Sequence, residues 1–351
     1  MNRVVIIFSL CALFFSSCKK EDASETTVTA DPSGMGAYVS NEGSFMNNNA
    51  SVSYIAQNGS VLSDPYFDAN NFPMGDVLQS IAFQGNRGFA VLNNSQRVTI
   101  FDRITFEHIG EIEGCDYPRH MLPLSSSKAY LTNGSMSGQV LIVDLNTLSI
   151  SGSVNVGNGP ERMTRSGDVV FVANSGGWLS DNTVSIINAT NDAFLNSVTV
   201  GDRPIDMVTD ATGDVWVLCA GVVLYDENWN ITGHTAASLY RLAQDGTVEW
   251  SALIGNEGDH PDDLAVSPDG QTVYYNNNGI HSLSISAPDE PHSVMLSGAF
   301  HSLDVNPETG DLWLTSIPDF VTQSTVYRYS SGGALISSWQ TGIGANGVWW
   351  G

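Results

Sequence analysis

Short apolar stretches that run into asparagine and glycine recur along the chain. They are rich in β-branched and aromatic residues, which is typical of strands that end in turns. Successive copies begin roughly 40 to 58 residues apart, the range of propeller blades. The copies are AYVSNEG (37–43), FAVLNNS (89–95), KAYLTNG (128–134), VFVANSG (170–176), VWVLCAG (215–221), VYYNNNG (273–279) and LWLTSIP (312–318). This period predicts seven repeats of one β-unit.

Three further segments accompany this unit. One precedes it, as in YPRHMLPL (117–124), GPERMTRS (159–166), RPIDMVTD (203–210), HPDDLAVS (260–267) and FHSLDVNP (300–307). A second follows it, as in QVLIVDL (139–145), NTVSIIN (182–188) and STVYRYS (324–330), and a third closes the repeat, as in GSVNVG (152–157) and NSVTVG (196–201). Each repeat is therefore predicted to hold four strands.

The segment VVFVAN (169–174) is apolar on both faces, with Phe171 and Ala173 on one and Val170 and Val172 on the other. Strands buried on both faces usually belong to parallel sheets covered by helices. The connections here are too short and too polar for crossover helices, so neighbouring sheets must cover each other. Four-stranded antiparallel sheets arranged around an axis do so, and the sequence predicts an all-β, seven-bladed β-propeller.

The two ends of the chain complement each other. The first repeat starts directly at AYVSNEG and lacks the preceding strand, whereas the chain ends in GANGVWWG (344–351), which resembles that strand. We expect Val348, Trp349 and Trp350 to form the innermost strand of blade 1, which leaves no open blade edge. A loose C-terminal tail is the alternative, but two adjacent tryptophans are costly to expose to water.

The net charge of the chain limits the kinds of partner that it can bind. It carries 13 Lys and Arg against 37 Asp and Glu, a formal net charge of −24. Nucleic-acid binding requires cations that neutralise phosphates, so we expect no nucleic-acid partner. Such an acidic surface keeps an exported protein soluble and attracts cations.

Cysteines add little chemistry. Cys115 and Cys219 are far apart and no CxxC occurs, so two buried thiols are expected, with a disulfide as the alternative.

The first residues look like an export signal. A basic start at Arg3 precedes an apolar run (4–15) that is too short to span a bilayer. Ser16-Ser17 before Cys18 resembles the lipobox of bacterial lipoproteins, in which the cysteine is acylated. The alternative is an ordinary secretory signal with an incidental cysteine. We predict a signal peptide (1–17), a lipidated flexible tether (18–33) and a propeller (34–351), held at the outer membrane and exposed on the cell surface.

Several motifs carry a family resemblance. AYVSN, AYLTN and FVANSGG resemble the repeats of YVTN-type seven-bladed propellers. Together with the lipobox, the segments SNEGSFMNNNASVSYI (40–55), FPMGDVLQSI (72–81), GCDYPRHM (114–121) and GPERM (159–163) resemble the propeller lipoproteins of Bacteroidetes. The best-known of these bind vitamin B12 and partner a TonB-dependent cobalamin transporter. The resemblance thus implies capture of a corrinoid for nutrient uptake, with that transporter as partner.

Propeller topology gathers the starts of the inner strands at one end, called here the mouth. The side chains expected there are polar and differ between blades, whereas a purely structural ring could be repetitive. They are Gln79, Arg119, His120, Glu161, Arg162, Asp206, Asp263, His301 and Asn346. We assign Arg119 and Arg162 to an anionic or carbonyl-bearing ligand, with a structural ion pair to Glu161 as the alternative.

Long loops around the mouth carry aromatic residues. We expect ligand contacts from Phe45, Phe72, Trp178, Tyr225, Trp229 and Phe320. Aromatic walls over a polar floor suit a large ligand with an apolar plane and amide edges, such as a corrinoid, or a glycan. In the alternative interpretation, the polar ring merely hydrates the channel and the aromatics pack the loops.

An enzyme is the less favoured hypothesis. His120, Glu161, Asp206, Asp263 and His301 would meet at the mouth, which leaves room for metal-assisted or acid–base chemistry. No HExxH, GxSxG, P-loop or EF-hand motif occurs. We expect a binding protein without a cofactor of its own. A surface protein that binds a glycan or another protein and a metal-dependent lyase or hydrolase remain the alternatives.

Overall fold

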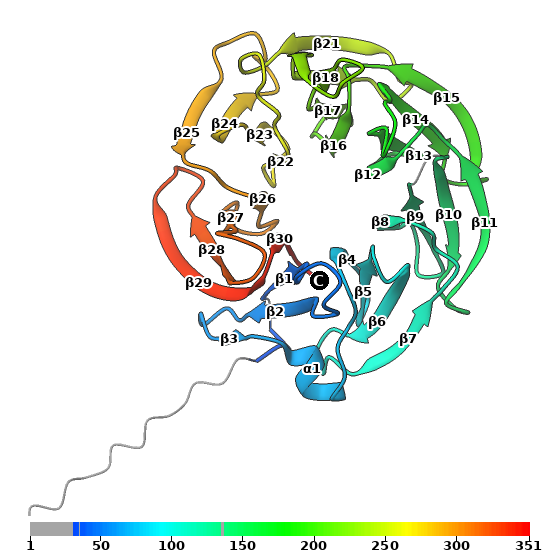
Figure 1. The fold of residues 1–351 in the computed structure, drawn as a ribbon, viewed down its shortest axis with the longest axis vertical. Helices are drawn as coiled ribbons and strands as arrows, with labels where there is room; N and C mark the ends of the chain where they lie inside the picture. The colour runs from blue at the N-terminus through cyan, green and yellow to red at the C-terminus, as the bar shows by residue number, and fades with distance from the viewer. Residues whose placement is uncertain (1–30, 35, 135–136) are drawn as a thin grey trace, which may run out of the picture.

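Seven four-stranded antiparallel sheets stand around a central axis in the computed structural model (Figure 1). The structure describes residues 31–34, 36–134 and 137–351. The predicted signal peptide, Cys18 and nearly all of the predicted tether lie outside the described residues. No helix in the described part of the chain is long and apolar enough to cross a membrane.

The inner strand of each blade lies nearest the axis, and three strands follow it outward (Figure 1). Blade 1 holds β30 (Ala345–Trp349), β1 (Ala37–Asn41), β2 (Ser51–Ile55) and β3 (Val61–Leu62). Blade 2 holds β4 (Leu78–Gln84), β5 (Arg87–Leu92), β6 (Arg97–Asp102) and β7 (His108–Ile112). Blade 3 holds β8 (Pro118–Pro123), β9 (Lys128–Asn133), β10 (Gln139–Asp144) and β11 (Ser149–Asn155).

The remaining four blades repeat this order. Blade 4 holds β12 (Pro160–Ser166), β13 (Val169–Asn174), β14 (Thr183–Asn188) and β15 (Ala193–Thr199). Blade 5 holds β16 (Pro204–Thr209), β17 (Val215–Cys219), β20 (Ser238–Leu242) and β21 (Val248–Leu253). Blade 6 holds β22 (Leu264–Val266), β23 (Thr272–Asn276), β24 (Gly279–Ser284) and β25 (Ser293–Ser297). Blade 7 holds β26 (Ser302–Val305), β27 (Leu312–Ser316), β28 (Gln323–Tyr329) and β29 (Leu335–Ile343).

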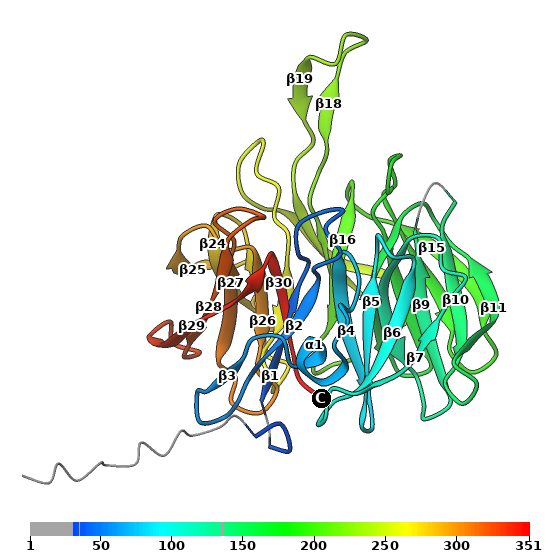
Figure 2. The same cartoon turned by 60° about the horizontal axis from the view of Figure 1, so that its bottom comes forward.

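Two elements stand outside this repeat. The short helix α1 (Pro65–Asn70) connects blades 1 and 2. The hairpin of β18 (Val223–Tyr225) and β19 (Ile231–His234) rises from blade 5, far above the rest of the ring (Figure 2).

The hydrophobic core lies between blades, as the two-faced apolar strands predict. One buried cluster joins Phe89 and Val91 of blade 2 to Ala129 and Leu131 of blade 3. Another joins Phe171 of blade 4 to residues of blade 5. Each blade thus supplies apolar cover for its neighbours, which explains why strands without crossover helices are buried on both faces.

Two of the recurring asparagines connect neighbouring blades at the mouth. Asn93 Nδ2, just after β5, donates to the Pro118 carbonyl at the start of blade 3 over 3.1 Å. Asn276 Nδ2 donates in the same way to the Phe300 carbonyl before β26, over 2.9 Å. Buried backbone carbonyls need hydrogen-bond donors, so these two asparagines stabilise the contact between adjacent blades.

The ring closes as predicted. Strand β30 pairs with β1, with Val39 opposite Val348 and Tyr38 opposite Trp349. The Trp349 indole Nε1 donates to Ser40 Oγ over 2.9 Å. The strand ends at Trp349, so Trp350 lies one residue beyond the predicted pairing. Cys115 and Cys219 are both buried and free, as expected for structural thiols.

Candidate functional site

A cavity of about 360 Å³ opens at the mouth. All nine polar side chains expected at the inner strand starts line it, so every blade contributes. Five further residues, which were not among the predicted ligand contacts, also line it: Glu42, Ser175, Arg203, Ile205 and Asp262. Glu42 is the first residue after β1, where the loop over the mouth begins.

A register shift explains why adjacent residues can share the cavity. The pairing of β8 with β9 shifts between Pro118 and Met121, and that of β12 with β13 shifts between Pro160 and Met163. Side chains in a regular strand alternate between faces, whereas an irregularity of this kind re-aims them. The PxxM spacing in the sequence therefore brings both residues between proline and methionine to the cavity.

One side of the cavity is closely paired. We call Glu42, Gln79, Arg119, Glu161 and Asn346 the paired half. The Arg119 Nε lies 3.0 and 2.9 Å from the two carboxylate oxygens of Glu161, and its Nη1 donates to Gln79 Oε1 over 2.6 Å. Asn346 Nδ2 donates to Glu42 Oε1 over 3.0 Å. This geometry favours the structural ion pair over direct ligand contact for Arg119.

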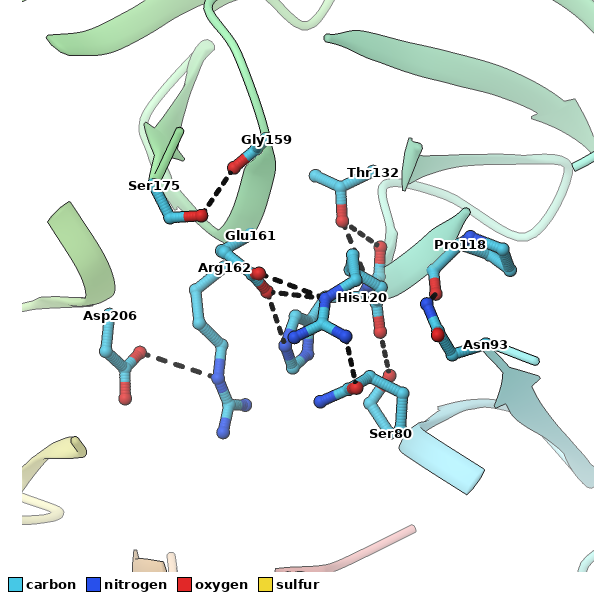
Figure 3. Close-up of polar contacts among 12 residues, drawn as sticks. Ser80, Asn93, Pro118, His120, Thr132, Gly159, Glu161, Arg162, Ser175 and Asp206 are labelled. Atoms are coloured by element: carbon cyan, nitrogen blue, oxygen red, sulfur yellow. Dashed lines mark hydrogen bonds and ion pairs between the residues drawn. The ribbon is translucent and has the colours of Figure 1, made fainter. Parts of the chain in front are cut away.

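Both histidines of the cavity are neutral at pH 7. Burial, followed by the charges of Arg162 and Arg119, holds the pKa of His120 well below its usual range. Burial also lowers the pKa of His301. His120 Nε2 lies 3.8 Å from Glu161 (Figure 3), too far for a hydrogen bond. Neutral imidazoles can donate or accept a hydrogen bond without adding charge to the site.

The other side of the cavity is crowded with acids. We call Arg162, Asp206, Asp262 and Asp263 the acidic half. Arg162 points into the centre of the ring toward Asp206 (Figure 3), with its Nε 3.6 Å from Asp206 Oδ1 and its Nη2 3.9 Å from Asp263 Oδ1. Among the described residues, its guanidinium makes no direct hydrogen bond, and it lies 5.2 Å from the Trp349 ring.

Burial shifts the acids of this half toward their neutral forms. It raises the pKa of Asp262 to about 7. It also raises the pKa of Asp263 far above its usual range, reinforced by the negative charges of Asp262 and Asp206. Asp206 accepts hydrogen bonds from the backbone amides of Met207 and Leu264, which hold it in place. Carboxylates this close cannot all ionise cheaply, so protons are shared among them.

A second cavity of about 280 Å³ shares Arg162 and Asp206 with the first. It is also lined by Asp304, Trp349 and Trp350. Burial raises the pKa of Asp304 to about 7, and its Oδ2 accepts from the Val348 amide over 2.8 Å. Arg162 and Asp206 therefore line both cavities.

The metal hypothesis requires three ligands at the mouth. Within residues 31–34, 36–134 and 137–351, no three His, Cys, Asp or Glu side chains are arranged to hold a metal ion. The carboxylates of the acidic half face Arg162 instead. The described part of the chain thus offers no ligand set for a metal-dependent lyase or hydrolase.

The six predicted aromatic contacts do not line the cavity. Phe320 comes nearest, with its ring 6.3 Å from that of His301. Phe45 and Trp178 are exposed in loops of the mouth face, and the tilted rings of Tyr225 and Trp229 lie 5.9 Å apart on the β18–β19 hairpin. They form a rim above the polar cavity rather than its walls.

The predicted position of Phe72 is wrong. Its ring packs 5.8 Å from Tyr66 of α1 and 5.6 Å from His108, the first residue of the outermost strand of blade 2. Phe72 therefore covers the outer edge of blade 2 instead of facing the mouth, and the chain after it passes to the mouth face, where Asp76 Oδ2 accepts a hydrogen bond from the Met46 amide over 2.9 Å.

The chain belongs to a family described as a domain of unknown function (DUF5074), whose model matches residues 35–343. None of the curated proteins compared with the chain matches it.

Several solved structures are similar to this propeller. A putative 6-phosphogluconolactonase from Bacteroides fragilis NCTC 9343 is 13% identical, with a TM-score of 0.63 over 90% of this chain and 98% of that one. A quinonprotein alcohol dehydrogenase-like protein from Bacteroides thetaiotaomicron VPI-5482 is 14% identical, with a TM-score of 0.63 over 91% and 79%. The hydrazine synthase of Kuenenia stuttgartiensis is 16% identical, with a TM-score of 0.57 over 74% and 85%. At these identities the likeness concerns the fold alone.

Proposed function

We propose that this member of the DUF5074 family is a binding protein that captures a large ligand at its mouth, with a corrinoid such as vitamin B12 as the favoured candidate. One observation carries the proposal. Nine polar side chains of six residue types, drawn from all seven blades, line a single cavity of about 360 Å³. Concave sites with a few convergent polar groups are the usual places for small-molecule binding.

The size of the cavity defines how such a ligand would lie. Sites for drug-sized ligands span roughly 300–1,000 Å³, so this cavity holds only one edge of a corrinoid. The amides on that edge would meet the neutral His301 and the acids around Asp263. The flat ring would then rest against the rim, where Trp178 and Trp229 are exposed. Aromatic side chains with an apolar body and a polar tip suit that position.

The charge of the cavity argues against a phosphorylated substrate of the kind named for the lactonase-like neighbours. Five carboxylates line it against three guanidinium groups. Arg119 is already engaged by Glu161, and Arg162 faces Asp206 and Asp263. A phosphate would therefore have to compete with these carboxylates for Arg119 and Arg162, which disfavours its binding. An uncharged ligand rich in hydrogen-bonding groups avoids this competition.

Capture of a glycan or a protein is the second candidate, and the rim supports it. Tyr225, Trp229 and Ile231 on the β18–β19 hairpin are exposed, as is Trp178. Apolar groups gathered on one face of a soluble domain are typical of interaction sites. This candidate uses the same face but needs no contact with the acids below.

The cellular setting rests on the sequence. Lipidation of Cys18 would tether the propeller to the outer membrane through residues 18–33, at the surface where a TonB-dependent transporter could receive the ligand. Incorporation of labelled palmitate into the full chain tests this point. Cys18→Ala should abolish the label, and label that persists in the variant would refute the anchor.

Calorimetric titration tests the ligand. The protein that begins after Cys18 is titrated with cyanocobalamin, and we expect saturable one-to-one binding. Asp263→Asn should weaken it, whereas Asp245→Asn, an exposed turn residue far from the cavity, should leave it unchanged. If Asp263→Asn leaves the affinity unchanged, the ligand binds at the rim and not in the cavity. An intact, folded protein that gives no heat with cyanocobalamin would refute the corrinoid assignment.

A further inference from the structure

The second cavity, of about 280 Å³, lies farther along the axis than the cavity at the mouth. The inner strands begin at the mouth, and the residues that line this cavity come later in each strand. On β16 they include Met207 and Val208, which follow Asp206, and on β30 they include Trp349, which follows Asn346. We call this space, which is bounded by blades 4 to 7 and blade 1, the inner cavity.

Most of the wall of the inner cavity is apolar. Leu264 and Leu303 contribute aliphatic surface, and Trp349 and Trp350 contribute aromatic surface. The polar residues among those that line it are Arg162, Asp206 and Asp304. A concave and mostly apolar space with a few polar groups is the usual form of a small-molecule site.

Arg162 brings unused hydrogen-bond donors to the inner cavity. Its guanidinium carbon lies over the Trp349 ring, 5.2 Å from the ring centre, so the N–H groups around the edge of the guanidinium remain available. The carboxylate oxygens nearest to that edge are 3.6 and 3.9 Å away, too far for direct hydrogen bonds. The side chain is 24% exposed, and none of its nitrogens is among the buried polar atoms that lack a partner. A ligand in the cavity can therefore reach these donors.

Asp304 brings an acceptor to the same cavity. Its Oδ2 accepts from the Val348 amide over 2.8 Å, which fixes the position of the carboxyl group. Its Oδ1 has no hydrogen bond to any described residue, and it is not among the buried unpaired atoms either, so it is open to the cavity. Asp304 acts on the charge of Arg162 without forming an ion-pair contact with it in the described part of the chain. A group of a ligand can therefore lie between the two side chains.

The chemistry of these two side chains selects the group that fits between them. A carboxylate would accept from Arg162, but Asp206 and Asp304 would repel it. An ammonium group would pair with the acids, but Arg162 would repel it. A primary carboxamide is neutral and carries an acceptor oxygen beside N–H donors. It can therefore bond to Arg162 and Asp304 at once without either repulsion.

We propose that the inner cavity is a second binding site, which takes a small aromatic carboxamide. The carbonyl oxygen of the ligand accepts from the Arg162 guanidinium, one of its N–H groups donates to Asp304 Oδ1, and its ring lies against the apolar wall. An aromatic ring is favoured there because Trp349 and Trp350 bound the space, and aromatic pairs attract each other beyond the area that they bury. An apolar cavity of roughly 150 Å³ holds benzene, so about 280 Å³ is room for one ring with a carboxamide group.

Bridging water is the competing explanation of the unused groups. A water molecule in a cavity needs two to four polar partners. Arg162, Asp206 and Asp304 supply such partners at one part of the wall, whereas the leucines and tryptophans supply none for water in the rest of the space. A ligand that is polar at one end and apolar at the other matches this uneven wall better than water does.

Indole N–H resonances in a ¹H–¹⁵N NMR spectrum of the protein that begins after Cys18 test the proposal. Benzamide is added at pH 8, where Asp304, with a pKa of about 7, is mostly ionised. It should shift the Trp349 resonance saturably and leave that of Trp216, which is fully buried in blade 5, unchanged. N,N-dimethylbenzamide accepts hydrogen bonds but cannot donate them, so it should bind roughly five- to ten-fold more weakly, as loss of one hydrogen bond implies.

A pair of matched variants separates the inner cavity from the mouth. In Asp304→Asn the side-chain oxygen is held by the Val348 amide, so the NH₂ group replaces the acceptor that the ligand needs. This variant should weaken benzamide binding roughly five- to ten-fold. Asp263 lines the mouth cavity but not the inner cavity, so Asp263→Asn should leave benzamide binding unchanged.

The opposite results would overturn the proposal. No shift of the Trp349 resonance at saturating benzamide would mean that water alone occupies the inner cavity. Binding that is weakened by Asp263→Asn but not by Asp304→Asn would place the carboxamide at the mouth. Toluene that binds as tightly as benzamide would show that the cavity does not recognise the amide. The corrinoid assignment is tested with another ligand and with Asp263→Asn, so either assignment can fail without the other.

Discussion

The two halves of the mouth cavity hold their charges in different ways. In the paired half, Arg119 meets both carboxylate oxygens of Glu161 at 2.9 to 3.0 Å. In the acidic half, Arg162 stands 3.6 and 3.9 Å from Asp206 and Asp263, too far for direct hydrogen bonds. One arginine thus makes short hydrogen bonds with a single acid, and the other is shared at longer range among several acids.

This difference separates structural support from a site open to ligand. Charge-assisted pairs with short contacts are strong and hold their partners in fixed positions. Buried acids that lie farther from a shared cation compete for it and for protons. Their contribution to the free energy of folding therefore depends on pH and on any hydrogen-bond partner that a ligand adds. We infer that the paired half orients the cavity, and that the acidic half responds to what enters it.

Breaking the paired half should have the largest effect on stability. Glu161→Ala removes the partner of Arg119, whose side chain is only 21% exposed. Removing one member of a buried pair typically costs about 3–5 kcal/mol, because the other charge is left uncompensated. Urea denaturation measures this loss. The double variant Glu161→Met with Arg119→Met should recover much of it, and a loss below about 1 kcal/mol in the single variant would show that the pair is not structural.

Removing the cation of the acidic half should cost less, and the cost should depend on pH. Arg162→Met leaves Asp206, Asp263 and Asp304 without their shared positive charge. We expect a loss of about 2 kcal/mol at pH 8, below the cost of breaking a close buried pair because no direct hydrogen bond is lost, and a smaller loss at pH 5, where protonated acids need no cation. Equal losses at both pH values in urea denaturation would contradict this description of the acidic half.

The acids themselves predict how stability varies with pH. Burial raises the pKa of Asp304 and that of Asp262 to about 7, against about 3.9 in the unfolded chain. The folded state therefore binds more protons between about pH 4 and 7, and these groups lower stability as the pH rises through that window. Asp304→Asn keeps an acceptor for Val348 and should flatten the decline of the melting temperature between pH 5 and 8. An unchanged slope would mean that Asp304 does not titrate in this range.

The smallest effect is expected at the rim, which belongs to neither half. Trp229 is 80% exposed on the β18–β19 hairpin. Trp229→Ala should change the free energy of unfolding by less than about 0.5 kcal/mol, as is usual for exposed positions. Its effect on ligand binding then reports recognition alone. A large loss of stability on heating would show that the hairpin is packed more tightly than its exposure indicates.

The ring could be predicted from the sequence because each blade corresponds to one sequence repeat. Strand pattern, repeat period and the split blade at the two chain ends lead to seven blades, and the inner strand starts lead to nine lining residues of the mouth. The sequence gives the ion pair between Arg119 and Glu161 only as an alternative to ligand contact. The two residues belong to different blades, and the distance between blades is not visible in the sequence. Phe72 was misplaced because loop length does not reveal whether a loop crosses the mouth or follows the outer edge.

A crystal structure of the protein grown with cyanocobalamin tests the ligand site most directly. We predict that one edge of the corrinoid lies in the mouth cavity, with its amides within hydrogen-bonding distance of Asp263 or Asp206, while Arg119 keeps its contacts with Glu161. A corrinoid bound elsewhere, or a mouth that stays empty at saturating ligand, would contradict the assignment of the acidic half as the binding surface.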